Sequence, residues 1–484
     1  MFDLVLRSGR IVTPDGVVMG DLGVTGGSIA AIGQGIEPGR KEIDVTGKLV
    51  FPGIVDAHVH LGVPIKETTS ADDVESGTRA AVFGGVTTVI DFTVQAPGES
   101  LLASVERRKA GIAGKAYVDV GLHANFTDFT EANLAELPKV VAAGLPSIKV
   151  FTAYGEAGMQ LADDAIVRIA EATGKARGLL MVHAENGSAV DFLTARFRAA
   201  GQTAAPMHEK SRPDLVEAEA VHRVATLARL AGCPLYVVHL SSARGLEVIR
   251  RFRAEGWQIH AETCPQYLLL DKKRYDGEEG HRYIASPPLR SQADRQALTS
   301  AVTGGEIEVV ATDHCPFRLS QKDVAPGDFS RTPNGLPGVE TLFPLMFSHL
   351  VALGDGGLTP RSNASLILLA RVLAENPARL FGLAPKKGAL RAGADADFFV
   401  FDPNPIRHIR AVDLHGAADW SPFEETEVRG EIRSVYLRGQ RIVDGGQLYS
   451  GPGSGQFVPG TPPREDSRKD EPTPIITTPP GAGR

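Results

Sequence analysis

The residues with the clearest chemical potential are two histidines at the end of an apolar stretch near the N-terminus. In LVFPGIVDAHVHLG, residues 49–62, an apolar run stops at Asp56 and is followed by His58 and His60. Alternate side chains of an extended strand point to the same side, so both imidazoles would face one way. Two imidazoles at the end of a buried strand form half of a metal site. A pair of structural histidines is the alternative, because HxH alone is a weak signal.

Four more polar side chains lie at or near the ends of other strand-like runs, where a charge is costly without a partner. Neutral imidazoles and a carboxylate suit a divalent metal such as zinc, whereas the ammonium of Lys149 would repel it. A lysine there makes sense if carbon dioxide converts it into an anionic carbamate whose two oxygens bridge two cations. Taken singly, each residue also has a structural explanation. The six candidate ligands are His58, His60, Lys149, His183, His239 and Asp313.

The elements that must position these residues alternate between strand and helix. Eight apolar runs, separated by helical patterns, predict an α/β fold, a parallel (β/α)8 TIM barrel with its reactive groups at the C-terminal ends of the strands. Helices are expected at 74–82, 101–112, 134–143 and 163–173, and in a long stretch reaching Leu230. After the run that begins at Leu49, the predicted strands are Thr87–Phe92, Val118–Asn125, Ser147–Ala153, Leu179–Glu185, Leu235–Ser241, Trp257–Cys264 and Ile307–His314.

Both ends of the chain have β-like patterns. We expect residues 1–50 and 385–450 to pair into one small β-sandwich domain beside the barrel of residues 51–384. A turn is predicted at Asn404-Pro405, and another where two glycines follow Asp444. The tail, residues 451–484, is rich in proline, glycine and charge, so we expect it to be largely disordered or draped over a neighbour.

The composition is that of a globular protein with a large core. Of 484 residues, 43% are hydrophobic and 23% are charged, and the formal net charge is −7. A mildly acidic chain without long basic runs gives no electrostatic reason to bind nucleic acid or an anionic membrane. The three widely spaced cysteines argue against a disulfide framework. The N-terminus does not read as a secretory signal, and no apolar run approaches the ~20 residues that span a bilayer, so a cytoplasmic location is expected.

Several motifs together resemble the cyclic amidohydrolases, and in particular the dihydropyrimidinase or hydantoinase branch. The similarity extends from about Phe2 to Val458. It implies a homotetramer and a binuclear zinc site bridged by N6-carboxylated Lys149 and a hydroxide. His58, His60 and Asp313 would then bind one metal, and His183 and His239 the other. The motifs are DAHVH, SIKVFTAY, VHAENG, LYVVHLS, ETCPQYLLLD, SPPLR, TDHCPF and PNGLPGVE.

The resemblance also implies a mechanism. The bridging hydroxide attacks a ring amide carbonyl of a small cyclic substrate, and Asp313 takes the proton and returns it to the leaving nitrogen. Tyr154 matches the family's tyrosine that donates to the developing oxyanion, although its sequence alone favours a packing aromatic. Ser286 and Asn334 match positions that contact the imide edge of the substrate, chiefly through main-chain groups. From the sequence alone, both lie in Pro/Gly-rich turns.

The substrate is less sharply defined than the reaction. Dihydroorotases have an arginine where this chain has Gly62, and the apolar residues that follow suit a neutral ring rather than a carboxylated one. Gly62 also differs from the asparagine typical of allantoinases and from the polar residue usual in hydantoinases, and GLPGVETLFPL resembles the dihydroorotase and allantoinase branches. Opening of a dihydropyrimidine or 5-substituted hydantoin to an N-carbamoyl amino acid is therefore expected, with allantoinase or dihydroorotase activity as the alternative. A non-catalytic scaffold is a third hypothesis, disfavoured because all six ligand positions are present.

Overall fold

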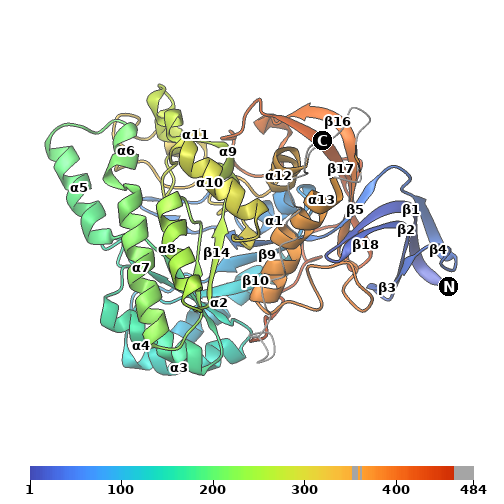
Figure 1. The fold of residues 1–484 in the computed structure, drawn as a ribbon, viewed down its shortest axis with the longest axis horizontal. Coiled ribbons are helices and arrows are strands. Elements are labelled where there is room, and N and C mark those ends of the chain that lie inside the picture. Colours follow the sequence, from blue (N-terminus) through green and yellow to red (C-terminus); the bar gives the residue numbers. More distant parts are fainter. Residues whose placement is uncertain (352–357, 360–361, 463–484) are drawn as a thin grey trace, which may run out of the picture.

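The centre of the molecule is a barrel of parallel strands, seen in a computed structural model that describes residues 1–351, 358–359 and 362–462. Each barrel strand pairs in parallel with the next, and a bridge between Val59 and His314 joins the two outermost members. The predicted TIM barrel is thereby confirmed (Figure 1). In spatial order the strands are β6 (Ile54–Val59), β9 (Val86–Phe92), β10 (Asp119–Asn125), β11 (Ser147–Phe151), β12 (Leu179–His183), β13 (Leu235–Val237), β14 (Ile259–Thr263) and β15 (Val309–Val310).

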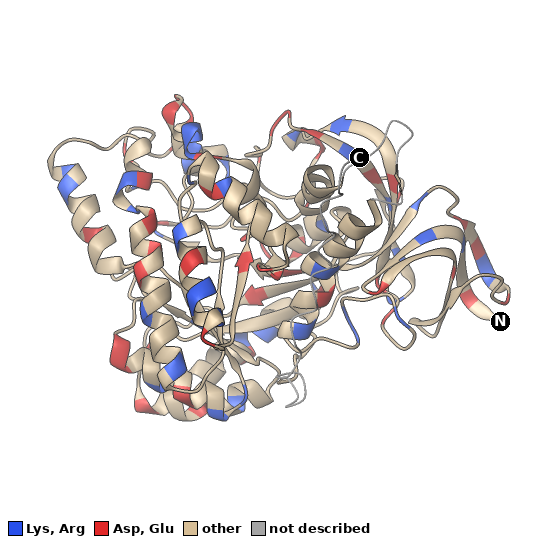
Figure 2. Cartoon of the chain, viewed as in Figure 1, with Lys and Arg blue, Asp and Glu red and all other residues tan. Residues whose placement is uncertain are grey.

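Amphipathic helices cover the outside of the barrel. In α8 (Ala243–Ala254), for example, Leu246 and Ile249 are buried, and Ser242 caps the first turn through its hydroxyl. Lys and Arg are interspersed with Asp and Glu along the outer helices (Figure 2). The other main helices are α1 (Val74–Phe83), α2 (Leu101–Ile112), α3 (Glu131–Ala142), α4 (Asp163–Lys175), α10 (Gln292–Thr303), α12 (Leu342–Leu350) and α13 (Ser362–Ala370).

The long helical stretch expected before Leu230 is three helices, α5 (Gly187–Ala199), α6 (Pro206–Ser211) and α7 (Asp214–Leu230). Gly201 has a φ of +67°, which ends the first of them, and Pro213 lies just before the third. A proline cannot donate the next helical hydrogen bond, so it separates the segments.

Strands from both ends of the chain form one sheet beside the barrel, as predicted. Its order is β19-β18-β17-β16-β5-β1-β2-β3, with β4 also paired to β1. The predicted turn at Asn404-Pro405 is wrong, because β16 continues through it with a register shift between Asp402 and Ile406. The strands are β1 (Phe2–Thr13), β2 (Gly16–Thr25), β3 (Ser28–Gly33), β4 (Gly39–Asp44), β5 (Leu49–Pro52), β16 (Phe398–His408), β17 (Glu427–Leu437), β18 (Gln440–Asp444) and β19 (Gln447–Leu448).

The apolar run that begins at Leu49 is divided between the two sheets. Its first part, β5, pairs with β1 and β16, whereas β6 belongs to the barrel. The change occurs at Gly53, where an added Cβ would lie 2.0 Å from Oγ1 of Thr87. Only glycine permits this approach, so the sheet boundary falls after Pro52 rather than at residue 50.

The start of the tail is folded onto its own barrel, so the disorder predicted from Gly451 is wrong as far as Pro462. Val120 of β10 donates to the carbonyl of Gln456 at 2.9 Å and accepts from the N–H of Val458 at 3.0 Å. Phe457 and Val458 pack against core clusters. The remainder of the tail, residues 463–484, lies outside the described residues.

Two further expectations concern cysteines and membrane segments. Cys233, Cys264 and Cys315 are buried free thiols. Within the described ranges, no helix is both long and apolar enough to cross a membrane.

Candidate active site

Three of the predicted ligands converge at the C-terminal rim of the barrel. His58 lies in β6, His60 follows that strand, and Asp313 follows β15. The Nε2 atoms of His58 and His60 lie 3.2 Å and 3.1 Å from Oδ1 of Asp313. Ligand atoms of all three residues lie within 4.8 Å of one another, a spacing suited to one cation.

Two more imidazoles form a neighbouring pair on the same rim. Nδ1 of His183, at the end of β12, lies 2.9 Å from Nε2 of His239, just beyond β13. The rings of His239 and His58 are 5.4 Å apart between centroids, which connects this pair to the first group. The structure thus brings together the imidazoles that the sequence placed on separate strands.

Lys149 lies within the same assembly and is unusually isolated for a lysine. It is 1% exposed, and its Nζ lies 5.0 Å and 5.2 Å from the ring centroids of Phe92 and Phe151. The described residues give Nζ no hydrogen-bond or ion-pair partner. Burial lowers the pKa of Lys149 to about 8, despite the opposing charges of Glu262 and Asp313. Burial thus increases the fraction of Lys149 that is a neutral amine near neutral pH.

Two buried carboxylates orient the histidines, and sequence reasoning assigned neither a role. Glu262 contacts Nδ1 of His58 and accepts from the main-chain N–H of His239 at 3.1 Å. Glu185 lies 2.8 Å from Nε2 of His183. When each carboxylate takes the N–H of its imidazole, the other ring nitrogen presents a lone pair to the centre of the site. The available signal was that Glu185 ends a predicted strand and that Glu262 lies two residues before the end of another.

This donor set fits a pair of divalent cations. Burial lowers the pKa of His58, His183 and His239, which favours the neutral imidazoles that bind metals. Nε2 of His58 and Nδ1 of His239 are buried without a hydrogen-bond partner among the described residues. Although burial raises it, His58 and His60 hold the pKa of Asp313 below its usual value, so this carboxyl stays anionic.

The backbone at the rim is strained where the reactive groups are attached. His239, Asp313 and Tyr154 have φ values of +39°, +50° and +71°. Such conformations are unfavourable for residues other than glycine, and they persist only where the surroundings enforce them.

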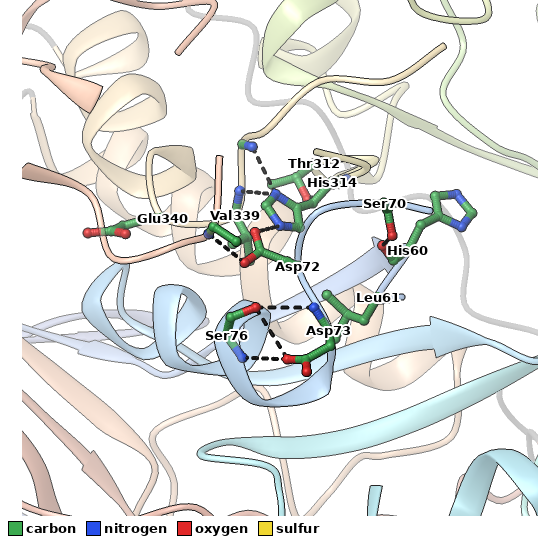
Figure 3. A network of polar contacts seen from close by, with 12 residues as sticks. His60, Leu61, Ser70, Asp72, Asp73, Ser76, Thr312, His314, Val339 and Glu340 are labelled. Atoms are coloured by element: carbon green, nitrogen blue, oxygen red, sulfur yellow. Dashed lines mark hydrogen bonds and ion pairs between the residues drawn. The ribbon is translucent and has the colours of Figure 1, made fainter. Parts of the chain in front are cut away.

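A network around His314 enforces the conformation of Asp313. Nδ1 of His314 accepts the N–H of Gly338 at 3.0 Å, and Nε2 lies 3.1 Å from Oδ2 of Asp72 (Figure 3). The carbonyl of His314 accepts the N–H of His60 at 2.8 Å. The residue after Asp313 is therefore fixed to three separate segments, which holds the carboxylate against its two histidines.

The three predicted substrate contacts face the same region. The ring of Tyr154 lies 4.7 Å from that of His183, and Nδ2 of Asn334 donates to Oγ of Ser286 at 2.8 Å. Burial raises the pKa of Tyr154, so its phenol keeps the proton. The main-chain N–H and C=O groups of Ser286 and Asn334 have no hydrogen-bond partner among the described residues. Free donors and acceptors of this kind match the edge of a cyclic imide.

Comparison with known proteins gives a consistent result. A model of the amidohydrolase family matches residues 49–442. A D-hydantoinase of Geobacillus stearothermophilus is 40% identical over 459 residues, which are 94% of this chain and 96% of the relative. The crystal structure of a dihydropyrimidinase from Brevibacillus agri has a TM-score of 0.91 at 35% identity, covering 95% and 99% of the two chains. An L-hydantoinase from Arthrobacter aurescens has a TM-score of 0.84 at 30% identity, covering 95% and 100%.

Proposed function

The chain belongs to the amidohydrolase family, and we propose that it opens the ring of a dihydropyrimidine or a 5-substituted hydantoin to give an N-carbamoyl amino acid. Relatives that match over nearly their whole length include hydantoinases and a dihydropyrimidinase. The reaction class is hydrolysis of a cyclic amide. Allantoinase or dihydroorotase activity is the alternative that the assay below separates.

Two divalent cations, proposed to be zinc, would occupy the rim. His58, His60 and Asp313 would hold one, and His183 and His239 the other. When bound, the cations lower the pKa of water so that hydroxide is available near neutral pH. The support for this assignment is the cluster of imidazoles, two of them oriented by carboxylates, in which Nε2 of His58 and Nδ1 of His239 have no hydrogen-bond partner among the described residues.

Lys149 would bridge the cations as a carbamate. The ammonium first loses a proton; the free amine then attacks carbon dioxide, a C–N bond forms, and a second proton leaves, so a cationic side chain becomes an anionic one. Because the pKa of Lys149 is lowered to about 8, a useful fraction of the free amine is present near neutral pH. Because no carboxylate in the described part of the chain pairs with Nζ, the amine is available for the reaction.

The remaining residues would handle the proton and the substrate. Asp313, anionic and fixed by its neighbours, would accept the proton of the attacking water and deliver it to the leaving ring nitrogen. Tyr154 would donate its phenolic proton in a hydrogen bond to the developing oxyanion. The unpaired main-chain groups of Ser286 and Asn334 would bind the imide edge.

The observation that carries the proposal is the convergence of the other five predicted ligands around buried Lys149, which has no partner among the described residues. Its test is an assay of purified protein with dihydrouracil, both enantiomers of a 5-substituted hydantoin, allantoin and dihydroorotate, together with elemental analysis. We expect about two metals per chain and hydrolysis of dihydrouracil or the hydantoin. Preferred turnover of allantoin or dihydroorotate would establish the alternative, and a metal-free, inactive protein would refute both. Light scattering tests the proposed homotetramer.

A further inference from the structure

A fully buried lysine that the proposed chemistry does not use lies next to the substrate-binding loops. Lys322, the last residue of α11 (Leu319–Lys322), has an exposed fraction of 0%. Its Nζ donates to the carbonyl of Ile284 at 2.8 Å and to that of Pro333 at 2.7 Å. Burying a long polar side chain is unfavourable, because it loses hydration and conformational entropy. The two hydrogen bonds to main-chain carbonyls compensate for this loss.

The two carbonyls belong to the loops that carry Ser286 and Asn334. Ile284 precedes Ser286 by two positions, and Pro333 directly precedes Asn334. The carbonyl of Ile284 also accepts the N–H of Gly335 at 3.1 Å. A single ammonium therefore ties together the two loops from inside the protein.

The contact between Lys322 and Pro333 determines where the N–H of Asn334 points. In a trans peptide, the C=O and the following N–H point in opposite directions. Because the carbonyl of Pro333 points at Lys322, the N–H of Asn334 points away from it. Within the described part of the chain, that N–H has no acceptor.

The other loop has the same arrangement with a different donor. His208 is 2% exposed, and its Nε2 donates to the carbonyl of Ala285 at 2.8 Å. The N–H of Ser286 is turned away from His208 for the same reason, and it too has no acceptor among the described residues. Each substrate loop thus has one buried side chain that fixes the carbonyl before the free N–H.

We propose that Lys322 and His208 are positioning residues that aim the main-chain N–H groups of Asn334 and Ser286 at the imide edge of the substrate. The inference rests on the proposed function, because it assigns the two loops to ring binding. Neither side chain touches the substrate. Lys322 serves equally as an ammonium or as an amine, because two hydrogens suffice for its two carbonyls.

The test is the kinetics of Lys322→Met, which keeps a long side chain and removes the donors. Misdirected loop groups weaken binding of the substrate and of the transition state alike, so KM rises while kcat changes little. We expect KM for the preferred ring to rise about 10-fold or more, since several hydrogen bonds each worth roughly a few-fold lose their alignment. Metal content stays at the wild-type value. His208→Phe, which keeps a ring without the donor, should also raise KM.

Asp323→Asn is the matched control on the neighbouring residue. Asp323 binds His281 and Arg282 and contacts neither loop carbonyl, so this change loosens the same segment and should leave KM unchanged. If Lys322→Met prevents folding, Lys322→Gln, which keeps an amide donor, should show a smaller rise in KM.

An unchanged KM in Lys322→Met, or an equal rise in Asp323→Asn, would overturn the inference while the proposed function stands. A fall in kcat alone would indicate a purely structural lysine and would also overturn it. A wild-type protein that opens no cyclic amide would remove the proposed function and this inference together.

Discussion

Each end of the barrel buries a lysine, and the two lysines have opposite surroundings. At the C-terminal rim, Nζ of Lys149 has no carboxylate of the described residues within ion-pair distance, and burial lowers its pKa to about 8. At the other end, Nζ of Lys387 lies 2.5 Å from Asp119 and 2.6 Å from Asp397. Although burial lowers it, these two carboxylates raise the pKa of Lys387 above its usual value.

The comparison distinguishes a ligand-binding site around Lys149 from a structural contact around Lys387. The charges around Lys387 are satisfied within the chain, and they join the barrel, through Asp119 of β10, to the segment before β16. Around Lys149, Nε2 of His58 and Nδ1 of His239 have no hydrogen-bond partner in the described ranges, and the backbone is strained. In TIM barrels the C-terminal end of the strands usually carries chemistry and the opposite end carries stability.

The largest effect is expected from Lys149→Ala, which removes the proposed carbamate. Activity should be lost, and short carboxylic acids added to the assay should restore part of it by standing in for the missing anion. Turnover equal to that of the wild type would show that the lysine has no bridging role. Denaturant unfolding of the metal-free proteins should show little loss of stability, because there the change removes an unpaired buried amine and breaks no ion pair.

Lys387→Met should have the reverse phenotype. It leaves Asp119 and Asp397 buried without this cation, a change that costs about 3–5 kcal/mol of the free energy of unfolding. Denaturant unfolding measures the loss, and kcat per folded chain should remain at the wild-type value. A stable Lys387→Met protein with impaired turnover would contradict the division between the two ends.

Glu262→Gln tests the orientation of the metal ligands. The amide keeps the shape of the side chain but weakens its hold on His58, and losses of this type lower metal affinity about 10- to 100-fold. Competition with a chelator gives the affinity. Glu308→Gln, at a partly buried glutamate that binds His260 away from the rim, is the control and should retain wild-type metal affinity.

A smaller effect concerns pH. Well below pH 8, the fraction of free Lys149 amine rises about tenfold per pH unit, because the pKa is about 8. After metal and carbon dioxide are removed, reactivation by zinc at fixed dissolved carbon dioxide should therefore quicken from pH 6 to pH 8 and then level off. A rate independent of pH would argue against carbamate formation at this residue.

Local sequence was sufficient to predict the barrel and the set of candidate ligands. The alternation of apolar runs with helical periodicity predicts strands such as β9 and helices such as α2. This works because the spacing of apolar residues along the chain reflects which face of each element is buried. His58 and His60 could be recognised for the same reason, since polar residues that end buried strands of a barrel must share one rim.

What only the tertiary structure decided depends on residues far apart in the chain. The division of the first apolar run at Gly53 follows from the close approach of Thr87, and the order in residues 451–462 follows from pairing with β10. The roles of Glu262 and Lys322 likewise come from partners on other segments. A side chain's type and its neighbours in sequence say whether it can be buried, but only the folded chain determines which atoms meet it there.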